Sequence, residues 1–547
     1  MDINALLNQP RHGNISPDWS WQDFAHAGAA LAEQLAHQPA THIALWFEDA
    51  ARFSAALFAA WQAGKTVLLP PAINADHLAW IAAHNALLIT DDESLDAFYH
   101  FRAADENKHA DLRFAIAPDA ELWLKTSGSS AAAKQIRKTC AQLCAEAAAL
   151  AAALPPEWRH ISAHASVSQQ HLYGLTFRIF TALACDWQIT RRQLRYPENL
   201  LSAGNSPCLW ISSPALLNHF GEQRDWASLH PYLRGIISAG GALPEHTRHN
   251  FKQHCAIDIL DIYGSSETGI IAMRRQAPDW QLFTGVNAGL DAAQCLWVES
   301  PWSSGREQSA DQAILKGKRL QLLGRSDRII KFADKRISLA QIEHQLICHD
   351  WVADAHCGVY GEHQRIAAWI ALSAAGIQAL REQGRAAVQN ALKHSLHTQQ
   401  ERLALPRYWR FAQALPRNAQ SKIQAQDFQQ AFAAPSQAPQ WQCLERSAET
   451  AHFQARVPLD LALFAGHFAD FPLVAGALEL QWVFALAEEL AWDALPAAQI
   501  EQLKFQQLIR PDDVIDLYLQ RNLGKAKFHF RLMAGEAVCA SGRWSKA

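Results

Sequence analysis

The sequence has no excess of basic residues, no long apolar run and no C-x-x-C pair of cysteines. Its 547 residues include 49 Lys and Arg against 53 Asp and Glu, a formal charge of −4, which argues against a nucleic-acid binder that relies on a basic face. No apolar run approaches the length of a membrane span, and the first residues lack the basic and apolar regions of a secretory signal. We therefore expect a cytoplasmic protein without an integral membrane segment.

The ten cysteines are scattered along the chain, so they are expected to be reduced and mostly buried. Cys140 and Cys144 stand four residues apart in an alanine-rich helical stretch. Small core residues are a better interpretation of this pair than a metal or redox site.

A chain of 547 residues is too long for one ordinary core, so we expect two or three domains. Its first part alternates between two patterns. Residues 19–37 and 49–65 have helical periodicity, whereas 42–47 and 66–71 read as strands. This alternation predicts an α/β sheet with helical crossovers.

The rest of the chain has a different organisation. A smaller α+β unit is predicted from its strand at 365–373 and its helix at 377–396, and a Pro/Ala/Gln/Ser-rich stretch follows it. Beyond that stretch, several strands surround one apolar helix at 477–492, which predicts a separate α+β domain. The predicted division is a large domain at 1–326, a small domain at 327–432, a linker at 433–444 and a C-terminal domain at 445–547.

The stretch LKTSGSSAAAKQIRK, residues 124–138, combines small hydroxyl residues with positive charge. Backbone N–H groups in such a turn can converge on an anion, and a lysine can supply a mobile charge. The P-loop spacing GxxxxGK[ST] is absent, and taken alone a serine-rich surface turn is the commoner explanation. The candidate anion-binding residues are Thr126, Ser127, Gly128, Ser129, Ser130 and Lys134.

Four further motifs follow the loop in fixed order. They are ISAGGALP (237–244), IYGSSETG (262–269), LLGRSDRIIKFADKRISLAQIE (322–343) and LPRNAQSKI (415–423). Together with the loop they resemble the adenylate-forming superfamily of acyl- and aryl-CoA synthetases, over about residues 15–430. The resemblance implies an α/β adenylate-forming N-terminal domain with a small α+β swinging subdomain, and the use of ATP and Mg²⁺.

The resemblance also implies a reaction and roles for the first motifs. A carboxylate would attack the α-phosphate of ATP to give an acyl-adenylate and pyrophosphate, and a thiol would then take the acyl group. The loop at 126–134 would hold the β- and γ-phosphates. Tyr263 would pack on adenine, Ser266 would approach the α-phosphate, and Glu267 would be a catalytic residue and a ligand of Mg²⁺, which prefers carboxylate oxygen.

Other residues take their expected roles from the same resemblance. Gly240, Gly241 and Ala242 would form a wall beside adenine, where glycines let the backbone approach a flat base. Gly264 and Ser265 would complete the ATP-binding turn. Asp311 would accept the ribose hydroxyls, although here only the Asp of the family's three-residue motif remains. Arg325 would contact ribose or phosphate.

The last motifs imply motion and catalysis. Asp327 would be the hinge about which the small domain swings between adenylation and thioester formation. Lys422 would bridge the acid and the α-phosphate as negative charge builds. In QQHLYGL (169–175), His171 and Gly174 would line the acyl pocket, although a core histidine packed against Tyr173 is nearly as good an interpretation.

The phosphate loop departs from the family pattern. Ala131, Ala132 and Ala133 stand before Lys134, where the family usually has a second glycine and a proline. Alanine restricts positive φ, so the turn would be reshaped and ATP binding weakened. The lysine motif also has Ser421 where glycine is usual.

The segment LFAGHFADFPLVAGALELQW, residues 463–482, resembles hot-dog β-hydroxyacyl-thioester dehydratases, over about 445–547. The resemblance implies a C-terminal α+β hot-dog domain in which His467 removes the α-proton. Where that family has an acidic residue, this chain has Gln481, and an amide has no proton to titrate. Glu479 would lie roughly 200° around the helix from Gln481, so it is not a simple substitute. The other matching positions are Gly466, Phe468, Pro472 and Gly476.

This order of domains most resembles proteins of bacterial aryl polyene biosynthesis. That resemblance implies an aryl acid as substrate, CoA or the phosphopantetheine of an acyl carrier protein as thiol acceptor, and a homodimer through the hot-dog domain. Two alternatives stay open. One is a non-catalytic scaffold that binds acyl groups and carrier protein through degenerate sites, and the other is a dehydratase with a relic ligase, which Gln481 disfavours.

Overall fold

The computed structural model of the chain forms two compact units, Met1–Ser326 and Asp327–Ala547. Within the part of the chain that is described, no helix is both long and apolar enough to cross a membrane. The structure describes all residues except 10–11, 109, 111–112, 126–134, 202–205, 219, 221–225, 227–230, 242, 276–278, 333–334, 398–404, 419–422, 435, 467–469, 491, 493–496, 523–526 and 547.

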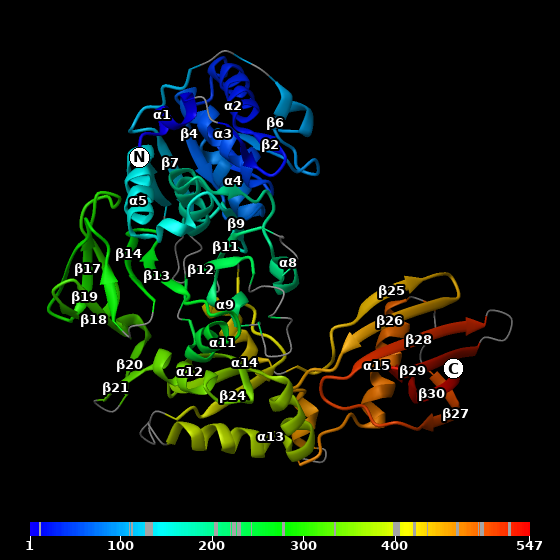
Figure 1. Cartoon of the computed structure of the whole chain (residues 1–547). Helices are drawn as coiled ribbons and strands as arrows, with labels where there is room; N and C mark the ends of the chain where they lie inside the picture. The colour runs from blue at the N-terminus through cyan, green and yellow to red at the C-terminus, as the bar shows by residue number, and fades with distance from the viewer. Residues whose placement is uncertain are drawn as a thin grey trace. The chain divides into compact units, whose positions relative to one another are not determined.

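The N-terminal part of the first unit is built on a six-stranded sheet (Figure 1). Its strands are parallel except for the last pair, which is antiparallel. The middle strands are apolar and buried along most of their length, as expected for a sheet covered on both faces. The strand order is β6 (Tyr99–His100), β5 (Leu87–Thr90), β3 (His42–Trp46), β4 (Thr66–Leu69), β7 (Glu121–Lys125) and β8 (Gln135–Thr139).

Two helices of this region begin at clear capping residues. The Ser20 side chain accepts a hydrogen bond from the Asp23 N–H at the start of α2 (Trp21–Ala36). The Asp49 carboxylate accepts from two N–H groups at the start of α3 (Ala50–Gln62). Helices and strands alternate along the chain in this region, which confirms the predicted pattern.

An eleven-stranded sheet forms the rest of the first unit (Figure 1). Its first five strands are parallel and the others pair antiparallel. The carboxyl ends of the parallel strands therefore meet at one edge. The strand order is β10 (Gln188–Ile189), β9 (Ser162–Ala165), β11 (Cys208–Ser212), β12 (Leu233–Ala239), β13 (Leu260–Ser265), β14 (Gly269–Arg274), β15 (Trp280–Leu282), β19 (Arg319–Arg325), β18 (Glu307–Lys316), β17 (Cys295–Glu299) and β16 (Asn287–Leu290).

The other helices and strands of the first unit connect these sheets. A small hairpin of β1 (Asn14–Ser16) and β2 (Trp19–Ser20) precedes α2. Cys140 and Cys144 lie in the helix after β8 and are buried free thiols, which confirms their interpretation as core residues. The helices are α1 (Ile3–Asn8), α4 (Ala75–Ala83), α5 (Cys140–Ala153), α6 (Leu172–Gly174), the π-helix η3 (Leu175–Thr181), α7 (Ala182–Cys185), α8 (Pro197–Leu201), α9 (Pro214–Leu217) and α11 (Glu245–Cys255).

The second unit begins with a small α+β region. A two-stranded hairpin precedes a three-stranded sheet, whose order is β22, β23 and β24. The long helix of this region bends at Gly384, where φ is 79°. The elements are β20 (Ile329–Phe332), β21 (Lys335–Ser338), α12 (Leu339–Ile347), β22 (Val352–Tyr360), β23 (Arg365–Leu372), α13 (Ala374–His397), β24 (Tyr408–Ala412) and α14 (Ala425–Ala433).

The C-terminal part of the second unit is a six-stranded antiparallel sheet with one helix, α15 (Gly476–Glu489) (Figure 1). Leu478, Trp482 and Val483 of this helix share one hydrophobic core with the sheet. The first strand begins at Gln442, inside the stretch 433–444 for which a linker is predicted. The strand order is β25 (Gln442–Arg446), β26 (Thr450–Arg456), β28 (Val514–Asn522), β29 (Lys527–Ala534), β30 (Ala537–Lys546) and β27 (Ala497–Phe505).

Candidate functional site

Several predicted site residues gather at the carboxyl edge of the eleven-stranded sheet. Gly240 and Gly241 follow β12 directly, and Gly264 and Ser265 end the neighbouring parallel strand β13. Both glycines after β12 are exposed, and Gly240 has a φ of +89°, which favours glycine. In open α/β sheets this edge is where ligands bind. The structure therefore offers a bare main-chain surface beside the end of β13.

Tyr263, Asp311 and Arg325 form a polar cluster next to that surface. The Tyr263 hydroxyl donates to Asp311 Oδ2 at 2.5 Å, and Arg325 Nη1 lies 3.7 Å from Asp311 Oδ1. Strands β18 and β19 pair antiparallel with Asp311 opposite Arg325, which explains how residues distant in sequence meet. Burial, and then the negative charge of Asp311, raise the pKa of Tyr263, so the phenol stays protonated. Asp311 thus presents carboxylate oxygens able to accept further hydroxyl donors.

Glu267 lies in the turn that joins β13 to β14. Ser265 and Thr268 hold this turn, since the Thr268 N–H donates to Ser265 Oγ and the Ser265 N–H donates to Thr268 Oγ1, both at 3.1 Å. Glu267 and Ser266 are half-buried. A strand bulge at Tyr263–Gly264 re-aims the backbone just before the turn.

A single carboxylate in this position suits Mg²⁺. Among the described residues, no group of three or more His, Cys, Asp or Glu side chains is arranged to hold a metal ion. Mg²⁺ commonly takes only one or two protein carboxylates and completes its shell with water and substrate phosphates. The one half-buried carboxylate of this turn, that of Glu267, is therefore compatible with a magnesium ion that arrives with a phosphate ligand.

The segment predicted to line an acyl pocket lies after β9 and is tightly packed. A Cβ at Gly174 would stand 1.9 Å from the Ser168 carbonyl oxygen, so only glycine fits there. The Tyr173 hydroxyl donates to the carbonyls of Ser212 at 2.8 Å and Ile237 at 3.2 Å. Burial lowers the pKa of His171 to about 4, so its imidazole is neutral at neutral pH.

Several predicted residues lie outside the described part of the chain. They are the phosphate-loop residues Thr126, Ser127, Gly128, Ser129, Ser130 and Lys134, then Ala242, Lys422 and His467. Asp327, the predicted hinge residue, lies in the 3₁₀ turn η4 (Ser326–Arg328) and is the first residue of the second unit.

A buried polar network next to the Glu267 turn was not predicted from the sequence. Lys138 on β8 is 1% exposed, and its Nζ donates to the carbonyls of Glu267 at 3.0 Å and Trp302 at 2.8 Å. The Glu146 carboxylate on α5 accepts from the Ile270 N–H at 2.8 Å. A detectable signal was present, because alternation along β8 places Lys138 on the same buried face as Ile136.

In the C-terminal domain, Gln481 occupies the position where the dehydratase family has an acid, and Glu479 is the nearby acid on the same helix, α15. The two side chains lie in different environments. Gln481 is exposed, whereas Glu479 is 4% exposed, as their angular separation along a helix predicts. Burial raises the pKa of Glu479 to about 7. Within the described residues, no donor lies within hydrogen-bonding distance of Glu479 Oε2.

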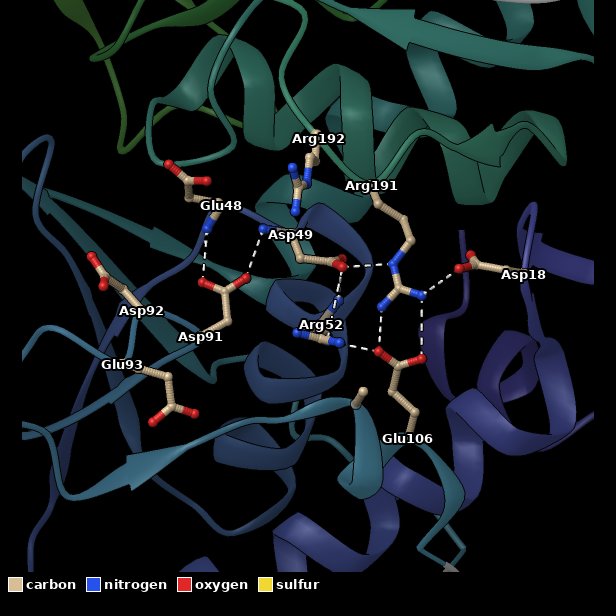
Figure 2. A pocket seen from close by; sticks show the side chains of 11 residues that line it. Asp18, Glu48, Asp49, Arg52, Asp91, Asp92, Glu93, Glu106, Arg191 and Arg192 are labelled. Atoms are coloured by element: carbon tan, nitrogen blue, oxygen red, sulfur yellow. Dashed lines mark hydrogen bonds and ion pairs between the residues drawn. The ribbon is translucent and has the colours of Figure 1, made fainter.

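A charged pocket of about 630 Å³ opens in the first unit near the ends of β3 and β5 (Figure 2). Arg191 is central to it. Its Nε lies 2.6 Å from Asp49 Oδ2 and its Nη1 lies 3.0 Å from Asp18 Oδ2, and it also pairs with Glu106. Arg52 Nε lies 2.7 Å from Glu106 Oε1, so the inner carboxylates are paired with arginine. The pocket is lined by Asp18, Glu48, Asp49, Arg52, Asp91, Asp92, Glu93, Ala103, Glu106, Arg191 and Arg192.

Replacing Arg191 by methionine is expected to lower the free energy of unfolding by about 3 kcal/mol, because it removes a partner from the largely buried Asp49 and Glu106 carboxylates. Arg191→Met and wild type are compared by urea unfolding. Arg192→Met is the matched control, since this neighbouring arginine is exposed, and its effect should stay within about 0.5 kcal/mol. Equal effects of the two substitutions would contradict a structural role for the Arg191 cluster.

Comparison with known families identifies both parts of the chain. Residues 13–291, just over half of the chain, match the family model described as AMP-binding enzyme. Residues 443–543 match the model described as ApeI-like: ApeI dehydratase. The fold expected for each part is therefore confirmed.

Individual relatives agree with the first match. A 4-coumarate–CoA ligase of Rhodobacter capsulatus is 24% identical over 339 residues, which span 58% of this chain and 79% of that protein. The crystal structure of the anthranilate CoA ligase AuaEII in complex with anthranoyl-AMP covers 79% of this chain and 97% of its own, with a TM-score of 0.66 and 16% identity. A benzoate CoA ligase from Burkholderia xenovorans LB400 covers 78% of this chain and 100% of its own, with a TM-score of 0.65 and 19% identity. The chain therefore belongs to the family of AMP-binding enzymes and carries an ApeI-like dehydratase domain at its C-terminal end.

Proposed function

We propose that the N-terminal part of the chain activates a carboxylic acid with ATP and passes the acyl group to a thiol. In the first step a carboxylate oxygen bonds to the α-phosphorus and the bond to pyrophosphate breaks, giving an acyl-adenylate. In the second step the thiol sulfur bonds to the acyl carbon, AMP leaves, and the thiol proton passes to solvent.

The observation that carries this proposal is the polar cluster of Tyr263, Asp311 and Arg325 beside the exposed Gly240–Gly241 backbone. A flat base can approach a main chain that lacks side chains, and Asp311 can accept hydroxyl donors from a ribose. The half-buried Glu267, four residues after Tyr263 in the β13–β14 turn, is the proposed ligand for Mg²⁺. These features together suit a nucleotide with its phosphates directed toward the β13–β14 turn.

The catalytic roles in this proposal follow the family motifs. Lys422 supplies a positive charge between the acid and the α-phosphate, where negative charge builds in the transition state. Bound Mg²⁺ would offset phosphate charge. Asp327 serves as the hinge that lets the small domain change orientation between the two steps.

The proposed substrate is an aryl acid. The similar proteins named above act on 4-coumarate, anthranilate and benzoate by name, and each of these acids has an aromatic ring. The neutral imidazole of His171 and the packed Tyr173 segment suit an uncharged pocket wall. The proposed acceptor is CoA or the phosphopantetheine thiol of an acyl carrier protein.

The acceptor and the acid can be tested together by mass spectrometry. The purified chain is incubated with ATP, Mg²⁺ and an aryl acid, first alone and then with CoA or a carrier protein. An acyl-adenylate in the first mixture and a thioester in the second are expected. A folded protein that forms neither product would contradict the proposal and favour the scaffold alternative.

For the C-terminal domain we propose binding of acyl thioesters with slowed dehydration. The reason is Gln481, whose amide cannot donate a titrating proton to a leaving hydroxyl. Gln481→Glu is expected to raise the dehydration rate of a 3-hydroxyacyl thioester by roughly 100-fold, within the usual range for general acid catalysis. Glu488→Gln, on an exposed part of the same helix, is the control. No gain in the Gln481→Glu variant would contradict the assignment of position 481.

A homodimer through this domain is proposed from the edge strand β27. Ile500, Leu503 and Phe505 on this strand are large apolar side chains that are at least one-third exposed. An exposed apolar edge strand is a template for pairing with another chain. A second copy of the chain is the proposed occupant, and light scattering should give twice the 60.8 kDa mass of one chain.

A further inference from the structure

A buried lysine connects the neighbourhoods of two segments that are proposed to bind ATP and its metal ion. Lys138 lies on β8, which begins directly after the 126–134 loop, and its Nζ donates to the Glu267 carbonyl at 3.0 Å. The two residues are 129 positions apart in the sequence. The bond therefore joins the strand after the predicted phosphate loop to the turn that carries the predicted metal ligand.

The surroundings of Lys138 fix its position. The same Nζ donates to the Trp302 carbonyl at 2.8 Å, and the side chain is 1% exposed. Burial lowers the pKa of Lys138, while the negative charge of Glu146 counters part of this effect. A buried amine with two fixed acceptors cannot drift as a surface lysine would.

Glu146 holds the start of β14, directly after the turn. Its carboxylate accepts from the Ile270 N–H at 2.8 Å and from the hydroxyl of Thr176 on η3 at 3.1 Å. A Cβ at Gly269 would stand 2.6 Å from Glu146 Oε1, so glycine is needed for the carboxylate to reach the turn. The main chain is thus held by buried charged groups at Glu267 itself and three residues later at Ile270.

We propose that Lys138 is a positioning residue for Glu267. By holding the Glu267 carbonyl, it fixes the turn from which that carboxylate would bind the Mg²⁺ that accompanies ATP. This inference rests on the proposed function. Lys138 itself contacts neither substrate nor metal in this proposal, and it acts only by orienting Glu267, the proposed metal ligand.

The test measures ATP binding rather than turnover. Calorimetric titrations of the full chain with ATP are run with Mg²⁺ and with EDTA, for wild type, Lys138→Met and Lys138→Arg. Methionine keeps the length of the side chain and removes the donor. We expect Mg²⁺ to increase the ATP affinity of Lys138→Met about 10- to 100-fold less than that of wild type, the range typical for partners of metal ligands. The ATP affinities of the two proteins in EDTA should be equal. Lys138→Arg keeps donors and should recover part of the loss.

Arg137→Met is the matched control, because Arg137 is the exposed neighbour of Lys138 on β8 and its replacement removes the same charge. It should behave as wild type. If Mg²⁺ increases the ATP affinity of both Lys138 variants as much as that of wild type, the positioning role is overturned while the proposed function stands. If wild type itself does not bind ATP, the proposed function is overturned and this inference falls with it. Should Lys138→Met fail to fold, the Lys138→Arg titration decides alone, and a full wild-type response would overturn the role.

Discussion

Lys422→Ala should reduce acyl-adenylate formation by at least about 100-fold, as expected when one group that stabilises the transition state is removed. The reason is charge, because the carboxylate and the α-phosphate are both anionic and approach each other in the first step. In the proposed mechanism the Lys422 ammonium lies between these two groups, so its removal would leave their repulsion largely uncompensated. The measurement is ATP-dependent adenylate formation in single-turnover mixtures, with the melting temperature as a check of folding.

Two comparisons make the Lys422 prediction specific. Gln424→Ala changes an exposed residue two positions away and should leave the rate unchanged. Because Lys422 is assigned only to the first step, the Lys422→Ala protein should still convert a supplied acyl-adenylate to the thioester. Equal rates of adenylate formation in wild type and Lys422→Ala would remove Lys422 from the mechanism.

Glu479→Gln should change how the stability of the C-terminal domain depends on pH. Burial raises the pKa of this carboxyl from an ordinary value near 4.5 to about 7 in the folded chain. Between these values the folded state holds a proton that the unfolded state has released, so stability falls as pH rises. From pH 4.5 to 7 the loss for this one group is about 3 kcal/mol. Above pH 7 the loss is complete.

Glutamine keeps the shape of the side chain and cannot ionise, so Glu479→Gln should lack this loss. The free energy of opening α15 is measured by hydrogen exchange at pH 5 and at pH 8. Between these two values wild type should lose about 3 kcal/mol of this free energy relative to the variant. Glu488→Gln, an exposed change on the same helix, should have the same small effect at both values. Parallel pH profiles for wild type and Glu479→Gln would show that Glu479 is not buried as described.

The fold was predictable wherever hydrophobic periodicity was strong. Helix α2 was expected at 19–37 and runs Trp21–Ala36, with Ser20 as the capping residue. Strand β25 was not expected, because all of its residues are exposed and it has no alternation of buried and exposed positions. Its position depends on pairing with β26, a contact between residues that no local pattern encodes.

The candidate site was predictable where a motif carries it and not where packing does. The prediction for Asp311 rested on a single residue of a motif, yet its carboxylate lies against Tyr263 and Arg325. Lys138 and Glu146 escaped notice because charged residues in a sequence are usually solvated. Only the assembled structure shows that a strand, a helix and a turn enclose both side chains.

ATP–pyrophosphate exchange reports directly whether this chain forms acyl-adenylates. The purified full chain is assayed with a panel of aryl and fatty acids, alongside Lys422→Ala. We expect exchange that depends on an aryl acid and is lost in the variant. Absence of exchange with every acid, from folded protein, would contradict acyl-adenylate formation and leave a binding scaffold as the better description.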